Sequence, residues 1–359
     1  MNNFYTELPP SAQTAYAQTL DHVTIAALHR SVADLTGSFA KKLVSGQEYW
    51  YFQYRDIDAR LKQVYLGPRS ERLERLIALK ESNVLSKQNA VARQARAALA
   101  LGNAGIVRSQ FRVIRRLEEY GFFQAGGVLI GTHAFACYGN MLGVAWDDSS
   151  KTQDVDFAYA GRSLALALPS DVKVDVHDAI SSLEMGFLPS SKLNGMQGGS
   201  YVIPNQPDFR LDFITTMGRK NDELIHFPNL NVAMIPLKFM EYSLKDIRQC
   251  ALLSDDGAIL VNLPSPARYA LHKLIVAAER GVSFRTKSNK DLKQSAALLR
   301  FLEEFQPEEL VDAWLDLEER GKGWCSRFNK GLSMMSKAFP EIDPVVEKIV
   351  AQVAESREH

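Results

Sequence analysis

The spacing of the apolar residues changes twice along the chain, near Gly126 and again at Pro264. Before Gly126 most apolar residues recur at helical spacing, and after it they form short runs typical of strands. Beyond Pro264 helical spacing continues almost to the end. Strands and helices segregated in this way favour an α+β fold. We predict three regions: a helical N-terminal region with a β-hairpin (1–105), a core on a mixed sheet (106–263) and a helical C-terminal domain (264–359).

The sequence of the N-terminal region predicts helices on both sides of one hairpin. Near-helical spacing over 10–44 favours an amphipathic helix pair. Two aromatic or β-branched runs over 48–66 flank the polar turn 55–60, which predicts a β-hairpin. Helical spacing then predicts two further helices, over 71–100 with Ser70 as its cap, and over 106–120.

The predicted hairpin is rich in aromatic rings, namely Tyr49, Trp50, Tyr51, Phe52 and Tyr54. Such rings can stack on nucleobases. A hairpin that covers a helical layer needs aromatic side chains as well, because they fit a half-buried pleated surface. We favour packing as the interpretation of these rings.

The core predicts several short strands. A buried strand over 127–130 runs into Gly131-Thr132, which begins a helix over 133–141, and 153–160 is a second strand. The later elements are a helix over 175–184 capped by Asp175, strands over 200–203 and 209–215, a hairpin over 252–263, and helices over 267–280, 288–305, 307–320, 326–338 and 344–354.

The composition is that of a globular protein. Apolar residues make up 46% and charged residues 23% of the 359 residues, which excludes a chain that is disordered or a coiled coil throughout. No apolar run approaches the roughly 18–20 residues that cross a bilayer, and the first ten residues do not resemble a signal peptide. We therefore expect a cytoplasmic protein without membrane association. Cys137, Cys250 and Cys325 lie far apart, which favours reduced thiols over disulfides or a zinc site.

The net charge of zero hides an asymmetry. Residues 1–120 contain 17 Lys and Arg against 11 Asp and Glu, so the rest of the chain is net negative. No Asp or Glu interrupts residues 87–116. The basic residues of this segment can contact nucleic-acid phosphates, or they can form a solvated helix face. Both interpretations stay open. The arginines of the segment on the predicted helix 106–120 are Arg108, Arg112, Arg115 and Arg116.

Two acidic residues share one side of the strand predicted over 153–160. Because side chains alternate between the faces of a strand, Asp154 and Asp156 point one way and their apolar neighbours the other. The same alternation over 209–215 directs Asp212 outward. Carboxylates that converge from neighbouring strands need a cation to stay ionised, and their oxygens suit Mg²⁺ or Mn²⁺ better than zinc. The pattern therefore predicts a divalent metal site at these three aspartates.

Gly131-Thr132 lies where a predicted strand meets a predicted helix. Glycine lets the backbone approach a ligand closely, threonine adds a hydroxyl, and the helix start adds free N–H groups. These features suit a phosphate group beside the metal site.

Other motifs are absent or structural. Asp56 and Asp58 form a second Asp-x-Asp pair, but they lie in the polar turn 55–60, where Asp is favoured for backbone reasons. The chain contains none of the motifs GxxxxGK[ST], HExxH and GxSxG. The sequence therefore does not indicate a P-loop ATPase, a zinc protease or a serine hydrolase.

The site motifs resemble the nucleotidyltransferases of the DNA polymerase β superfamily, which carry a Gly-Ser or Gly-Gly turn, then Asp-x-Asp and a later Asp. The matching residues are Gly131-Thr132, Asp154-Val155-Asp156 and Asp212. The Gly-Thr-His-Ala turn, the long gap to Asp154, and Thr152 before Asp-x-Asp-Phe are similar to the branch with abortive-infection and toxin–antitoxin nucleotidyltransferases. The resemblance covers about 126–305 and implies a nucleotidyltransferase core.

The resemblance extends to two predicted helices. His272-Lys273-Leu274 with Arg280 is similar to a Lys-Leu helix that ends in Arg, and Lys290-Asp291 to the start of the next helix, although Gln294 replaces a common Asp. Lys273 on an apolar helix could also simply reach solvent. The resemblance implies nucleotide binding by Gly131, Thr132, Lys273, Lys290 and Asp291, with Lys273 on the triphosphate and Asp291 ordering the site.

The activity implied is metal-dependent transfer. An acceptor hydroxyl attacks the α-phosphate of an NTP and pyrophosphate leaves, with Asp154, Asp156 and Asp212 as catalytic metal ligands. The acceptor can be RNA such as tRNA, a protein or a small molecule. The alternative is a catalytically degenerate nucleotidyltransferase fold that binds nucleic acid or regulates. Three intact aspartates favour the enzyme.

Overall fold

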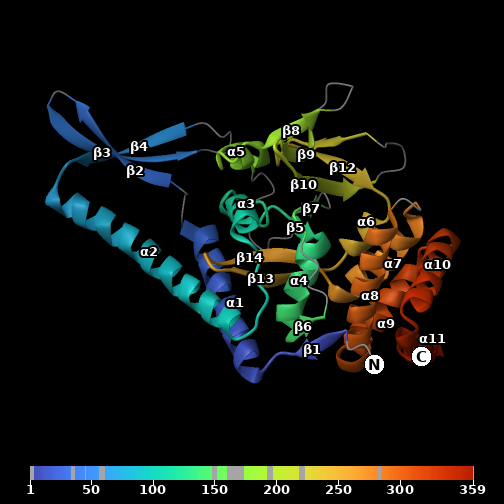
Figure 1. Ribbon diagram of the computed structural model, residues 1–359. Helices are drawn as coiled ribbons and strands as arrows, with labels where there is room; N and C mark the ends of the chain where they lie inside the picture. The colour runs from blue at the N-terminus through green and yellow to red at the C-terminus, as the bar shows by residue number, and fades with distance from the viewer. Residues whose placement is uncertain are drawn as a thin grey trace.

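The structure is a computed structural model with a central sheet between an N-terminal arm and a C-terminal helical bundle (Figure 1). The fold is α+β, as the segregation of apolar patterns predicts, and its central sheet is mixed, as predicted for the core. The described residues are 4–33, 37–44, 46–55, 61–147, 152–159, 174–191, 197–217, 223–281 and 284–358.

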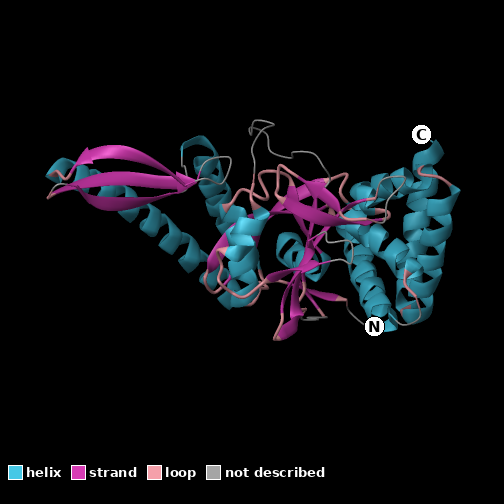
Figure 2. Cartoon of the chain, turned by 90° about the horizontal axis from the view of Figure 1, so that it is seen from above, coloured by secondary structure: helices cyan, strands magenta, loops and turns pink. Residues whose placement is uncertain are grey.

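The arm consists of two helices and a three-stranded sheet. α1 (Pro10–Ala33) leads into β2 (Gly37–Val44), β3 (Gln47–Arg55) and β4 (Leu61–Pro68), which pair antiparallel in that order. α2 (Glu71–Ala100) then runs from this sheet back to the core, and Figure 2 shows the sheet at the outer end of the arm. Ser70 caps α2, as predicted, because its Oγ accepts the Leu73 N–H at 3.2 Å.

The prediction of a second N-terminal helix is wrong. Residues 37–44 form strand β2, which pairs with β3 along its whole length, from Gly37 opposite Tyr54 to Val44 opposite Gln47. Pairing with a neighbouring strand overrides the weak helical spacing of this segment. The predicted hairpin at 48–66 is therefore two strands of a three-stranded sheet. Its turn, with Asp56 and Asp58, lies outside the described residues.

The central sheet contains every strand predicted between 127 and 215. β7 (Val155–Tyr159) runs parallel to β10 (Gln206–Thr216) and antiparallel to β5 (Gly127–Ile130), so the sheet is mixed. β9 (Gln197–Ile203) and β12 (Val232–Leu237) pair with different parts of the other edge of β10. The remaining strands are β8 (Leu188–Ser191) beside β9, and β11 (Ile225–Phe227) beside β12.

The two faces of this sheet belong to different cores. On one face the rings of Phe157 and Phe213 stack at 5.1 Å in the main core, which also includes residues of α3 (Arg108–Glu119) and α5 (Val176–Ser181). On the other face Ile130 and Ile214 pack with Met240 of the short α6 (Met240–Ser243). Because side chains alternate along a strand, Asp156 and Asp212 project from this second face.

The C-terminal bundle lies beside that second face. In the sequence the bundle follows the hairpin of β13 (Ile247–Ser254) and β14 (Gly257–Pro264). Helix α4 (Gly131–Leu142) directly follows β5 in the central sheet. β1 (Tyr5–Glu7) pairs with β6 (Val144–Trp146), which brings the N-terminus to the bundle, where the rings of Tyr5 and Phe301 are 5.5 Å apart. The bundle comprises α7 (Pro266–Glu279), α8 (Arg285–Phe305), α9 (Pro307–Glu319), α10 (Lys322–Ala338), the short η2 (Pro340–Ile342) and α11 (Asp343–Glu358).

Two predictions about the chain as a whole can be compared with the structure. Cys137, Cys250 and Cys325 are free thiols, as predicted. None of the described helices combines the length and the apolar character that a membrane span requires.

Candidate active site

Neighbouring strands bring two carboxylates side by side. Asp156 of β7 is paired with Asp212 of β10 in the parallel ladder and with Ile130 of β5 on its other edge. Residues paired across strands project to the same face of a sheet, so the two carboxylates share one. Asp154 directly precedes β7 and is half-buried. We call Asp156 and Asp212 the acidic pair.

The electrostatics of the acidic pair follow from this crowding. Burial, and after it the neighbouring charge of Asp212, raises the pKa of Asp156 to about 6; Asp154 adds to the rise, and Lys273 and Arg210 oppose it. Asp156 is therefore a carboxylate that lacks enough positive charge around it. A cation at this point would relieve the repulsion.

Gly131 is the residue that lets Asp156 occupy this place. Its φ is +67°, and a Cβ added to it would lie 2.2 Å from Oδ2 of Asp156. Any other residue would collide with the carboxylate and would also adopt a strained backbone. The predicted glycine turn at the start of α4 and the predicted Asp-x-Asp strand are thus in direct contact.

Gly131→Ala is expected to destabilise the protein by more than the ~1 kcal/mol that a left-handed backbone costs an alanine, because the new methyl group must displace Asp156. The matched control is Gly186→Ala, since Gly186 has a φ of +81° and open space around its Cβ position. Thermal unfolding of both variants measures the difference. Equal losses of stability would contradict the contact with Asp156.

Asp212 is already held by protein groups. The Oγ of Ser200 donates to its Oδ1 at 2.5 Å, and both Nε and Nη2 of Arg210 lie 2.9 Å from its Oδ2. Asp212 as a whole is 8% exposed. Arg210 thus supplies a positive charge at the acidic pair, and a metal ion would compete with it for Oδ2.

Lys273 and Asp291 meet between α7 and α8. The Nζ of Lys273 lies 2.6 Å from Oδ1 of Asp291, and the Nε of Arg280 lies 2.9 Å from its Oδ2. Burial opposes the charge of the ammonium, but the Asp291 carboxylate and the Tyr269 hydroxyl together raise the pKa of Lys273 above its ordinary value. The charge of Lys273 reaches Asp156, whose pKa it lowers. The structure therefore places the charged Lys273, which Asp291 holds by an ion pair, close enough to the acidic pair to act on Asp156.

Tyr269 on α7 is a site residue that sequence reasoning missed. Its hydroxyl lies 2.8 Å from the carbonyl oxygen of Gly131 and 2.9 Å from Oε1 of Gln294, and it can donate to one of them at a time. Tyr269 thereby ties the bundle to the glycine turn. A tyrosine in a mostly apolar helix carries no sequence signal for such a role.

Gln110 on α3 is a second such residue. Its Nε2 donates to the carbonyl oxygen of Thr152 at 2.6 Å, and its Oε1 accepts from Nε2 of His133 at 3.0 Å. This orientation leaves His133 as the donor, because an amide oxygen can only accept. Burial and the nearby charge of Lys290 lower the pKa of His133 to about 4. Gln110 thus joins the segment before Asp154 to the first turn of α4.

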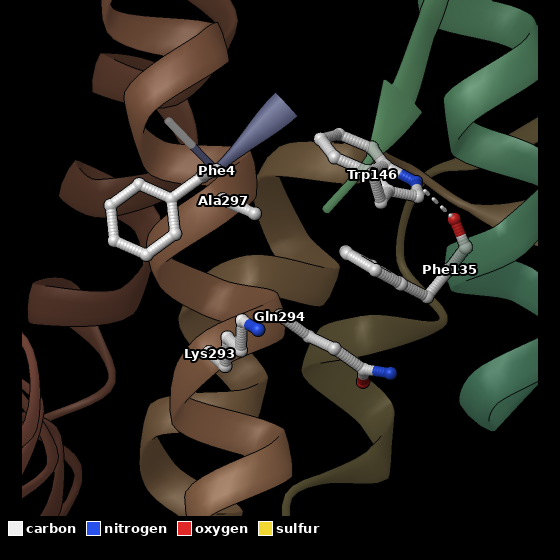
Figure 3. Close-up of a pocket in the computed structure, with 6 residues that line it drawn as sticks. All are labelled: Phe4, Phe135, Trp146, Lys293, Gln294 and Ala297. Atoms are coloured by element: carbon white, nitrogen blue, oxygen red, sulfur yellow. Dashed lines mark hydrogen bonds between the residues drawn. The ribbon is translucent and has the colours of Figure 1, made fainter. Parts of the chain in front are cut away.

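The remaining predicted nucleotide-binding residues lie in the same region. Thr132 is half-buried in the first turn of α4, and Lys290 on α8 is half-buried near His133. A small pocket, shown in Figure 3, is lined by Phe135, Trp146, Phe4 and residues of α8 that include Gln294. Gln294 connects this pocket to Tyr269.

The arginines predicted to form a basic stripe, Arg108, Arg112, Arg115 and Arg116, are less free of acidic neighbours in the structure than the sequence indicates. Arg108 is 3.2 Å from Asp256 at the tip of the β13–β14 hairpin, and Arg115 and Arg116 pair with Glu119 at 3.0 and 3.3 Å. Acidic partners from outside 87–116 thus neutralise part of its charge. Arg112 is exposed, and nucleic-acid contact by the four arginines stays a prediction.

The donors present fit a divalent cation in part. Within the described ranges no group of three or more His, Cys, Asp or Glu is arranged to hold a metal ion. The acidic pair nevertheless offers two hard carboxylate donors on one face, with Asp154 close enough to raise the pKa of Asp156. Carboxylate oxygens are ligands that Mg²⁺ and Mn²⁺ prefer, and a metal ion bound to Oδ2 of Asp212 would have to displace Arg210.

The mixed sheet thus presents an acidic pair against a glycine turn, with the half-buried Lys273 near it. A family profile described as nucleotidyltransferase matches residues 108–319. The match spans more than half of the chain and includes the acidic pair, Gly131 and Lys273, so this chain belongs to that nucleotidyltransferase family.

Two further comparisons add little. The crystal structure of an antigenic nucleotidyltransferase-like protein from Paracoccidioides brasiliensis is similar over 63% of this chain and 95% of that chain, with 14% sequence identity and a TM-score of 0.30. A likeness this distant carries no argument about the site. The comparison with curated proteins found no match.

Proposed function

We propose that this protein transfers a nucleoside monophosphate from an NTP to an acceptor hydroxyl and releases pyrophosphate, in a metal-dependent reaction. The observation that carries the proposal is the pairing of Asp156 with Asp212 directly against Gly131, in a chain of a nucleotidyltransferase family. The elevated pKa of Asp156 supports it, because it marks a place where positive charge is needed.

Each residue of the site has a role in this proposal. Asp156 and Asp212, with Asp154 beside them, would hold the divalent cation, which lowers the pKa of the attacking hydroxyl and neutralises charge on the phosphate. The Gly131 turn and the hydroxyl of Thr132 bind phosphate oxygens at the start of α4. Lys273, with support from Lys290, binds the β- and γ-phosphates, where charge builds as pyrophosphate leaves.

Asp291 and Arg280 position Lys273. The ammonium group has three donors, and Asp291 occupies one of them in the structure, so the others can reach phosphate oxygens. Asp291 also keeps the lysine charged in a half-buried position. Its role is to order the lysine rather than to contact substrate.

One observation favours the alternative of a degenerate fold. Arg210 and Ser200 already satisfy both oxygens of Asp212, as they would in a site that no longer binds metal. In this case the protein binds nucleic acid or acts as a regulatory module.

For the enzyme, the Gly131-Thr132-His133-Ala134 turn supports membership of the abortive-infection and toxin–antitoxin branch. The proposed acceptor is RNA (such as tRNA) or a protein.

Label transfer tests both possibilities. The protein is incubated with α-labelled NTPs and total cellular RNA or protein, with and without Mg²⁺ or Mn²⁺, and γ-labelled NTP serves as the control. We expect label from the α position only, and only with metal. Calorimetry of NTP binding is the second measurement. Absence of transfer, together with an NTP affinity that is the same with and without Mg²⁺ or Mn²⁺, would support the degenerate fold.

A further inference from the structure

One face of the arm's sheet carries three tyrosines in contact. Tyr51 of β3 is paired with Tyr65 of β4, and their rings are 5.5 Å apart. The Tyr49 and Tyr65 rings are 6.0 Å apart, and Lys42 of β2 is paired with Tyr49. Tyr65 is 53% exposed. We call the surface formed by Lys42, Tyr49, Tyr51, Gln63 and Tyr65 the tyrosine face.

The polar groups on the tyrosine face are amides and a cation. The Nζ of Lys42 lies 4.9 Å from the centroid of the Tyr51 ring and donates to Oε1 of Gln63. The hydroxyl of Tyr49 donates to Oε1 of Gln47 at 2.9 Å. Both amide oxygens thus accept bonds, and their Nε2 groups can donate to a ligand.

Among the residues whose side chains the structure describes, the tyrosine face carries no acid. The register puts Ala40, Gln47 and Gln53 on it with the residues named above. Glu48 projects from the opposite face and pairs with Arg69 at 2.9 Å.

The described residues leave the tyrosine face without a cover. Within the described part of the chain, β2, β3 and β4 make extensive contact only with one another. The first turn of α2 approaches from the opposite face, where Lys41 lies 3.6 Å from Glu74. Figure 2 shows this sheet at the far end of the arm, away from the central sheet and the bundle.

We propose that the tyrosine face binds single-stranded RNA. Exposed rings on a sheet suit unstacked bases, which a duplex does not present. Lys42 complements a phosphate, and the glutamine amides can bond base edges and the 2′-hydroxyl, which is the group that distinguishes RNA from DNA. The charge agrees, because the described strands carry Lys41, Lys42, Arg55 and Lys62 against the single acid Glu48.

The proposal concerns binding and does not depend on transfer at the acidic pair. Its test is fluorescence anisotropy of a labelled rU12 oligonucleotide with the full-length protein. We expect Tyr65→Ala and Tyr51→Ala to weaken binding about 10-fold or more, because each removes a ring on which a base stacks. Tyr65→Phe keeps the ring and is expected to bind within 2-fold of the wild type.

The matched control is Leu43→Ala. Leu43 is 72% exposed and lies on the opposite face of β2, so its truncation is expected to leave rU12 binding unchanged. Lys42→Ala should reduce the salt dependence of binding. If Tyr65→Ala lowers the melting temperature, Tyr65→Leu replaces it, since leucine keeps apolar bulk without a stacking ring.

Three results would overturn the proposal: no binding of rU12, equal binding by Tyr65→Ala or Tyr65→Leu and the wild type, or equal affinity for rU12, dU12 and duplex RNA. NTP binding, measured by calorimetry on the same variants, is expected to be unchanged. RNA binding and nucleotide transfer can therefore fail separately.

Discussion

Asp156→Asn is expected to reduce nucleotide transfer by about 10³-fold or more. The change removes a charged ligand from the acidic pair, and charge stabilisation by a bound metal is worth several kcal/mol, at about 1.4 kcal/mol for each factor of ten. The measurement is the initial rate of α-label incorporation at saturating Mg²⁺. Asp212→Asn is expected to have a similar effect, because the two residues are paired on adjacent strands.

The matched control for this loss is Asp312→Asn. Asp312 is exposed on α9, outside the site, and the same chemical change there is expected to leave the rate within 2-fold of the wild type. A rate of the Asp156→Asn variant close to that of the wild type would mean that another group performs the chemistry.

The same variant tests the pKa of Asp156 through stability. The folded protein holds this proton with a pKa of about 6, against an ordinary value of 3.8, so between these pH values the folded state binds more protons than the unfolded state. Stability conferred by this proton is present at low pH and is lost as the pH rises through that window, by at most ~3 kcal/mol.

Without divalent cations, thermal unfolding of the wild type and of Asp156→Asn from pH 4 to 7 checks this expectation. The wild type should lose stability relative to the variant as the pH rises, and at pH 7 the variant should be equally stable or more stable. A variant that is clearly less stable at pH 7 would show that the ionised carboxylate is favourably solvated in the fold.

Lys273→Ala is expected to lower both triphosphate affinity and stability. The lysine faces the β- and γ-phosphates in the proposed function, so NTP binding should weaken about 10-fold or more, and NMP binding much less. Removal of one partner of a buried ion pair leaves Asp291 with Arg280 alone, which costs ~3 kcal/mol. Calorimetry with NTP and NMP and thermal unfolding measure the two effects.

A double variant separates these two effects. Lys273→Ala with Asp291→Ala removes both buried charges, so part of the lost stability should return while NTP affinity stays low. Lys337→Ala, at an exposed position of α10, is the control for loss of a lysine as such. Equal losses of NTP and NMP affinity would instead place Lys273 near the base or the α-phosphate.

The elements of the core could be predicted from local patterns. The strand at 127–130 has the predicted bounds, and the helices that start at Glu71 and Pro307 begin where Ser70 and the proline predict. These features depend on residues a few positions apart, whose spacing decides which face is apolar. The prediction was wrong at β2, because a strand beside β3 is defined by its partner rather than by its own spacing.

The sequence by itself determined that Asp156 projects from a strand away from the buried Phe157, and that a glycine turn begins the preceding helix, because both follow from alternation and from backbone freedom. Only the tertiary structure decided that Asp212 is the neighbour of Asp156, that Tyr269 and Gln110 support the site, and that Asp256 meets Arg108. The order of strands and the packing of the bundle settle these contacts, and both depend on residues far apart in the chain.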